Sequence, residues 1–248
     1  LGVEDMRSAM GLSEDYFSLE RKAFIEKWMG RTAYDLTRQT TPESWNKIVE
    51  ALNKTQEDIV TDRREQKNML VLAGPGSGKT KVLAHRIAFL LRVMRENPKG
   101  ILVLTYNRHA AVEVRVRLRG LVDDDANGVT ILTCHALALR LTGASFVDRT
   151  PGNDEFADVI KNAVSLLKGE GLQPEDADEQ RDRILSGFRW ILVDEYQDMA
   201  AEQYELISAL AGRTLSEPDR RISLFAVGDD DQSIYSFRGA SVAYIQAF

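Results

Sequence analysis

Short apolar runs alternate with longer amphipathic stretches along most of the chain. The apolar runs predict buried strands at 69–72, 101–104, 129–132, 190–193 and 222–227. Between them, apolar residues recur at helical spacing over 79–97 and 110–119, which predicts amphipathic helices. The runs are continuously apolar instead of alternating with polar positions. This pattern favours an α/β fold with a parallel sheet that is covered by helices on both faces.

The first fifty residues are polar and follow a helical pattern, so we interpret residues 1–50 as a helical N-terminal extension or linker. One apolar face is predicted at helical spacing from Phe17, Phe24, Ile25 and Trp28. Thr41 followed by Pro42 is typical of a helix start, and we expect Asn53 to end the helix that follows. The aromatic side chains of this region are interpreted as core.

The composition is that of an ordinary globular chain. Of the 248 residues, 44% are hydrophobic and 28% are charged, which excludes a wholly disordered or fibrous protein. No apolar run approaches the roughly 20 residues that span a bilayer, so we expect no membrane partner. The single cysteine, Cys134, excludes an intramolecular disulfide framework and favours a cytoplasmic location. The net charge of −6 disfavours non-specific polyanion binding but is compatible with a local nucleic-acid groove.

A glycine-rich segment follows the first predicted strand and opens a predicted helix. Its residues are Ala73, Gly74, Pro75, Gly76, Ser77, Gly78, Lys79 and Thr80. Glycines let backbone N–H groups converge on phosphate oxygens, while Lys79 can reach the β and γ phosphates and Thr80 can ligate Mg²⁺. Ala73 stands where the strict pattern has glycine, and a plain glycine-rich turn is the alternative. The strand–loop–helix context favours a P-loop for a nucleoside triphosphate.

Two consecutive acids follow the predicted strand 190–193. Asp194 suits the Mg²⁺ that Thr80 would share, and Glu195 can orient and deprotonate the attacking water. Solvated loop charge is the alternative for such acids, as it is for the run 229–231. With a P-loop upstream, the catalytic interpretation is favoured.

A polar loop after the last predicted strand carries a third group of candidates. Gln232 can sense the γ-phosphate, and Arg238 adds a cation at the same sheet edge. Tyr235 and Phe237 are aromatics in a polar context, which is how single strands of nucleic acid are gripped, although burial of one ring is the alternative.

Several segments occur together in a fixed order: AGPGSGKT, LTYNRHAA, TCHALALRL, ILVDEYQD and VGDDDQSIYSFRGA. This set, with LNKTQ before it, resembles the UvrD/Rep-type superfamily 1 helicases over about residues 52–248. The resemblance implies ATP as the nucleotide, with Gln56 recognising adenine and Lys81 lying near the base. It also implies contacts to single-stranded DNA from Tyr106, Asn107, Arg108 and His135. Phe237 stands where the family usually has tryptophan, so weaker stacking is expected there.

The resemblance implies a RecA-like P-loop NTPase domain at 51–248, with a small helical insertion at 143–187 that is shorter than in the family. The expected function is the ATP-binding motor domain of a 3′-to-5′ DNA helicase or translocase. Because the chain begins at Leu1 and stops soon after the third motif, we expect a fragment whose second RecA-like domain lies downstream and which is weakly active alone. A nucleotide-responsive interaction module without translocation is the main alternative, and a small-molecule kinase is a weaker one.

Overall fold

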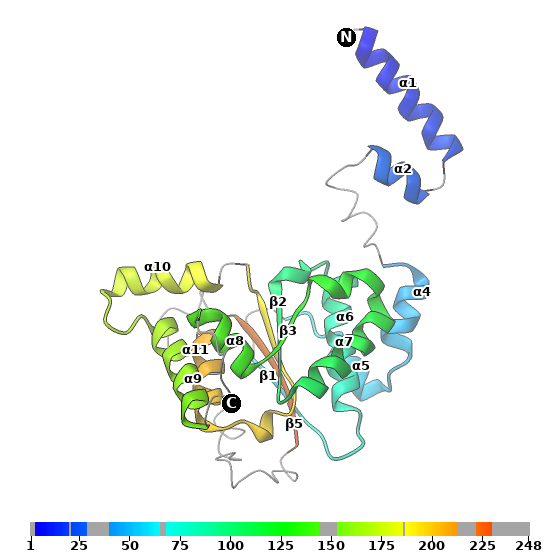
Figure 1. The fold of residues 1–248 in the computed structure, drawn as a ribbon. Coiled ribbons are helices and arrows are strands. Elements are labelled where there is room, and N and C mark those ends of the chain that lie inside the picture. The colour runs from blue at the N-terminus through cyan, green and yellow to red at the C-terminus, as the bar shows by residue number, and fades with distance from the viewer. Residues whose placement is uncertain are drawn as a thin grey trace.

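The structure, a computed structural model, describes residues 3–19, 21–28, 40–64, 68–143, 153–185, 187–212 and 222–229. Within these residues, five parallel strands form one sheet in the order β1-β5-β4-β2-β3 (Figure 1). The strands are β1 (Met69–Leu72), β2 (Ile101–Thr105), β3 (Thr130–Thr133), β4 (Trp190–Val193) and β5 (Ser223–Gly228). The predicted α/β class and parallel sheet are therefore confirmed, with strand ends that differ from the predicted ones by at most one residue.

Successive strand residues face opposite sides of the sheet, as strand geometry requires. Trp190 and Leu192 of β4 join one apolar cluster, whereas Ile191 and Val193 join the other. All four are buried. Because both faces are covered, the strands carry apolar residues at every position, which explains the continuous apolar runs.

One face is covered by helices from the first half of the chain (Figure 1). These are α4 (Pro42–Trp45), the π-helical turn η2 (Asn46–Glu50), α5 (Lys54–Val60), α6 (Lys79–Arg92) and α7 (Arg108–Val122). Every residue of α6 from Val82 to Leu91 is buried, because the sheet, η2, α5 and α7 surround it. The helix ends at Arg92, before the predicted end at residue 97. The positive φ of Arg95 and the turn η3 (Pro98–Gly100) follow.

The other face is covered by α8 (Cys134–Thr142), α9 (Asn153–Lys168), α10 (Pro174–Leu185) and α11 (Ala201–Ala211) (Figure 1). Helix α9 lies in the predicted insertion and packs on α8 and α11. Its buried residues are Val159, Ile160, Ala163, Val164 and Leu167. The insertion thus contributes to the core of this layer, while the acidic side chains of α10 are exposed, as predicted for its charged side.

The N-terminal region forms α1 (Val3–Ser18) and α2 (Arg21–Trp28), which lie apart from the sheet in Figure 1. Thr41 caps α4 as predicted, since its side chain accepts a hydrogen bond from the Ser44 N–H. The prediction for Asn53 is wrong: the residue begins α5 instead of ending the preceding helix. No helix in the ranges given above has the length and apolar character needed to cross a membrane.

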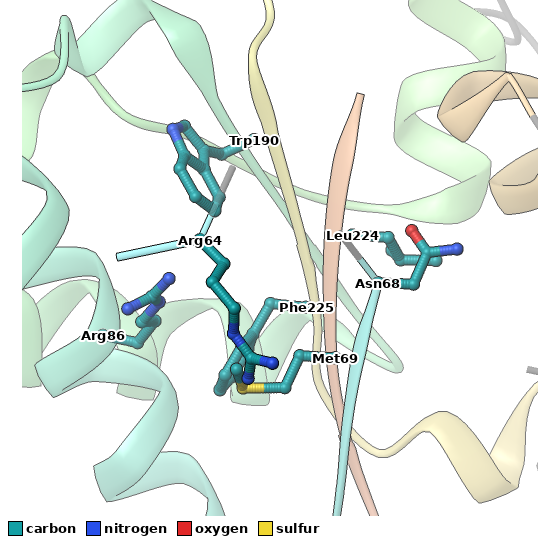
Figure 2. Close-up of a pocket in the computed structure, with 7 residues that line it drawn as sticks. All are labelled: Arg64, Asn68, Met69, Arg86, Trp190, Leu224 and Phe225. Carbon is teal, nitrogen blue, oxygen red and sulfur yellow. The ribbon is translucent and has the colours of Figure 1, made fainter. Parts of the chain in front are cut away.

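A small pocket of about 60 Å³ lies at the amino-terminal ends of β1, β4 and β5 (Figure 2). The guanidinium of Arg86 lies 5.3 Å from the ring centroid of Trp190 and 5.8 Å from that of Phe225. It also donates a hydrogen bond of 2.7 Å to the Val60 carbonyl. Burial lowers the pKa of Arg86 to about 10, a value at which the side chain stays charged at neutral pH. This residue therefore joins α5 to the sheet at the edge opposite the sequence motifs.

Candidate nucleotide-binding site

The sequence motifs meet at the carboxyl-terminal edge of the sheet. The last residues of neighbouring strands are in register, with Leu72 beside Gly228 and Thr105 beside Thr133. Val193, the last residue of β4, pairs with Ala226 of β5. The loop after β4 therefore begins near the same edge of the sheet as the loop after β5. Ligands of parallel sheets bind at this edge, where loops from strands that are distant in sequence converge.

The glycine-rich segment forms a tight loop between β1 and α6. Gly76 and Gly78 have φ values of 70° and 85°, in the left-handed region where a side chain is disfavoured. The Ala73 N–H donates to the Gly228 carbonyl at 3.1 Å, which ties the start of the loop to β5. Because α6 begins at Lys79, its N-terminal N–H groups and the positive end of its dipole lie at the loop, as an anion site requires.

The Lys79 ammonium donates three hydrogen bonds. It donates to the carbonyl oxygens of Ala73 and Gly74 at 2.9 and 3.3 Å, and to Asp229 Oδ2 at 3.0 Å. The side chains of Lys79 and Asp229 are only 8% and 1% exposed. Since an ammonium has three donors, a phosphate would have to replace one of these partners. Asp229, considered above as solvated loop charge, is instead a buried ion-pair partner; 230–231 lie outside the described residues.

Asp194 is a buried carboxylate at the end of β4. Its N–H donates to the Leu104 carbonyl at 2.9 Å, and its Oδ1 accepts from the Glu195 N–H at 3.1 Å. Burial, with the nearby charge of Glu195, raises the pKa of Asp194 to about 7. The nearby Lys79 ammonium offsets only part of this burial effect, so the residues present fit a divalent ion at Asp194.

Thr80, the predicted second ligand, lies in the first turn of α6 and carries a hydroxyl that could contribute. Nowhere in the described ranges do three or more His, Cys, Asp or Glu side chains converge as a metal-binding group. An ion at Asp194 would therefore rely on water and substrate phosphates as well, which is how Mg²⁺ is usually held.

Glu195 has an unusual backbone conformation and a well-defined partner. Its φ and ψ are both 51°, a left-handed conformation that is uncommon for a residue with a side chain. The Gln197 side-chain amide donates to Glu195 Oε2 at 2.8 Å and accepts from the Asp229 N–H at 3.0 Å. Gln197 and Asp229 are therefore part of the candidate site. The sequence pattern did not predict them, even though each follows a strand end as Asp194 and Glu195 do.

Asp198 adds a second carboxylate beside Glu195. Burial and the charge of Glu195 raise the pKa of Asp198 to about 6. Its Oδ1 is buried without a hydrogen-bond partner. Asp194, Glu195 and Asp198 therefore place three carboxyl groups within electrostatic reach of one another, an arrangement that a metal ion would stabilise.

Gln56 and Lys81 lie beside the glycine-rich loop. Gln56 Nε2 donates to the Ser77 carbonyl at 3.0 Å, while its Oε1 accepts from the Asn53 N–H at 3.4 Å. Lys81 Nζ donates to the Ala51 carbonyl at 2.7 Å. A glutamine amide has two N–H donors and two lone pairs, so Gln56 retains one donor and one acceptor for a base.

The predicted DNA contacts that the structure describes follow β2 and β3. Tyr106 is half-buried and Arg108 is exposed, whereas Asn107 caps α7 by accepting a 2.8 Å hydrogen bond from the Ala110 N–H. His135, in the first turn of α8, is half-buried, and burial lowers its pKa. The remaining predicted site residues, Gln232, Tyr235, Phe237 and Arg238, lie outside the described residues.

Comparisons with known proteins identify a family and several similar helicases. A family described as AAA domain matches residues 56–238. The chain is 29% identical to the ATP-dependent DNA helicase PcrA of Staphylococcus epidermidis, over 82% of this chain and 36% of that protein. It is 32% identical to the DNA helicase II of Salmonella typhimurium, over 81% of this chain and 36% of that protein. Unliganded Pif1 from Bacteroides sp matches with a TM-score of 0.40 and 16% identity, over 79% and 36% of the two chains.

The chain spans little more than a third of the length of these curated relatives. The alignment to the Staphylococcus protein extends over 274 positions, more than this whole chain contains, although it covers 82% of the chain. That relative therefore carries additional residues inside the matched region, which is consistent with a shorter insertion here.

Proposed function

The chain belongs to the AAA domain family, among the UvrD/PcrA-type superfamily 1 helicases, and from this premise we propose that it is the first RecA-like half of an ATP-dependent 3′-to-5′ DNA helicase or translocase motor. One observation carries the proposal: the P-loop lysine and the buried carboxylate of Asp194 occur at the same sheet edge. A triphosphate with its metal ion would neutralise the acids and give Lys79 a new partner.

The proposed binding roles divide between the loop and two strand ends. Backbone N–H groups of 73–78 and the N-terminus of α6 bind the phosphates, and Lys79 exchanges Asp229 for a phosphate oxygen. Thr80 and Asp194 hold Mg²⁺, which when bound neutralises charge on the phosphate oxygens. Gln56 and Lys81 contact the adenine side of the nucleotide.

The proposed chemical step is attack of water on the γ-phosphorus. Glu195 accepts the proton from this water, the new oxygen–phosphorus bond forms, and the bond to the bridging oxygen breaks to release ADP. Gln232 and Arg238 are proposed to respond to the γ-phosphate and to transmit its state to the DNA-binding loops. Cations from a second RecA-like domain are proposed to complete the site, since such arginine fingers contribute about 10³–10⁵ in rate.

Single-stranded DNA is the proposed polymer partner. Tyr106, Tyr235 and Phe237 are proposed to stack on bases, and Asn107, Arg108 and His135 to contact the strand near β2 and β3. Each lost stack should cost about 1–3 kcal/mol of binding free energy. Alanine at Tyr106, assayed by anisotropy of a labelled oligothymidine, tests this assignment, and unchanged affinity would refute it.

The proposal is tested by steady-state ATPase assays on the complete gene product, with and without single-stranded DNA. We expect strong stimulation by DNA in the wild type. In Glu195→Gln we expect ATP binding without turnover. ATP binding that is unaffected by DNA, combined with no stimulated hydrolysis, would instead indicate a nucleotide-responsive interaction module. Full turnover in Glu195→Gln would overturn the assignment of the base.

A further inference from the structure

Gln197 lies between two parts of the candidate site that are far apart in sequence. It follows β4 in the turn η5 (Tyr196–Asp198), and its side chain is only 2% exposed. One end of its amide reaches Glu195 Oε2 at 2.8 Å, and the other reaches the Asp229 N–H at 3.0 Å. The Asp229 side chain in turn pairs with Lys79. A continuous set of polar contacts therefore runs from the proposed base to the P-loop lysine.

The chemistry of the two partners fixes the orientation of this amide. A carboxylate only accepts hydrogen bonds, so the NH₂ group must face Glu195, and a backbone N–H only donates, so the carbonyl oxygen must face Asp229. Among the other residue types of similar length, methionine satisfies neither partner. Glutamate satisfies Asp229 alone and places a second negative charge beside Glu195.

The backbone of β5 approaches the Gln197 side chain closely. A Cβ atom at Gly228 would lie 3.0 Å from Gln197 Oε1 and 3.4 Å from Tyr196 Cβ, so β5 approaches this closely because residue 228 is glycine. On the other side, Glu195 is in a left-handed conformation. In the part of the chain that the structure describes, Gln197 is the residue whose side chain donates a hydrogen bond to the Glu195 carboxylate.

We propose that Gln197 is a positioning residue for ATP hydrolysis, which holds the Glu195 carboxylate in its catalytic orientation and anchors it to β5 through the Asp229 backbone. This inference rests on the proposed role of Glu195 as the base. Asp194 and Asp198 lie close enough to Glu195 to interact with it electrostatically, and without the amide bond the Glu195 carboxylate would be free to rotate. The bond to Gln197 Nε2 opposes that motion and leaves the other oxygen, Oε1, for the water.

The test compares Gln197→Met and Gln197→Glu with a matched control, Gln203→Met, in the complete gene product. Gln203 on α11 is also buried, and its Oε1 accepts from the Ala200 N–H at 3.2 Å instead of contacting Glu195 or Asp229. We expect both Gln197 variants to lower kcat by about 10- to 100-fold, the usual effect of losing a supporting hydrogen bond in a site. Affinity for a fluorescent ADP analogue should stay within about twofold. Gln203→Met should change thermal stability while retaining kcat.

Gln197→Glu tests the two contacts of the amide separately, because it keeps an acceptor for the Asp229 N–H but removes the donor to Glu195. Wild-type kcat in this variant would show that only the Asp229 contact matters and would overturn the proposal. Single-turnover hydrolysis in the Glu195→Gln background is the second measurement. If Gln197 acts through Glu195, adding Gln197→Met to that background should leave the residual rate unchanged. If Gln197→Met lowers the rate in this background by the same factor as in the wild type, Gln197 has a general structural role and the proposal is overturned.

Failure of this inference can be distinguished from failure of the proposed function. If Glu195→Gln abolishes turnover while both Gln197 variants hydrolyse ATP at the wild-type rate, Gln197 has no positioning role and the base assignment stands. If Glu195→Gln retains full turnover, the base assignment fails, and the inference about Gln197 fails with it.

Discussion

At the scale of single residues, the Asp194 carboxylate has an electrostatic cost in the free protein. It is 1% exposed, and burial raises its pKa from 3.8 to about 7. The folded chain then binds more protons than the unfolded chain between about pH 4 and pH 7, so the free energy of unfolding falls as the pH rises through this window. The proposed metal-binding role of Asp194 accounts for such a cost, because a bound cation would remove it.

We therefore predict that Asp194→Asn stabilises the nucleotide-free protein. The gain should be absent below about pH 4, increase up to pH 7 and reach at most about 4 kcal/mol. Urea unfolding in EDTA at pH 5, 6 and 8 measures it, with the exposed Asp124→Asn as the control. A variant less stable than the wild type at pH 8 would show that the ionised carboxylate has a compensating partner in the folded state.

The residue scale also shows what the sequence could predict. Lys79, Asp194 and Glu195 were identifiable because each occurs in a motif directly after an apolar strand. Gln197 and Asp229 were not identifiable, because their importance depends on a contact between the loop after β4 and the end of β5. The two residues are 32 positions apart in the sequence. A run of three acids after a strand gives no local sign that its first member is buried.

At the scale of elements, the Asn53 capping box connects a helix start to the nucleotide site. Asn53 Oδ1 accepts from the Gln56 N–H at 2.9 Å, and the Gln56 side chain returns to the Asn53 N–H. The same Gln56 side chain bonds to the Ser77 carbonyl in the glycine-rich loop. The sequence predicted a helix boundary here but assigned it the wrong direction, a helix end, because asparagine is common both at helix starts and just after helix ends.

We predict that Asn53→Ala destabilises the protein by about 1 kcal/mol, the typical effect of losing an N-cap, and weakens discrimination between ATP and GTP. The second effect follows because Gln56 would lose the contact that fixes its orientation. Thr41→Ala is the matched control, since it removes the cap of α4 without touching Gln56. Competition binding with both nucleotides measures the discrimination. If both variants lose the same amount of discrimination between ATP and GTP, Asn53 has no specific role in orienting Gln56.

At the scale of the whole molecule, the parallel sheet explains why the motifs meet. Strands that run in the same direction bring every following loop to one edge, and this much was predictable from the continuous apolar runs. The strand order was not predictable from the sequence, because β1 pairs with β5, and these are the first and last of the described strands in chain order. That pairing puts Lys79 and Asp229, 150 residues apart, into one buried ion pair.

We predict that this ion pair holds the loops that follow the neighbouring strands β1 and β5 together in the nucleotide-free protein. Lys79→Met should lower the free energy of unfolding by about 3–5 kcal/mol, because it removes the ammonium that pairs with the buried Asp229 carboxylate. Adding Asp229→Asn should recover part of the loss, since the neutral amide needs no counter-charge. Urea unfolding of the wild type, both single variants and the double variant measures the coupling. Strictly additive losses would show that the two side chains do not stabilise each other.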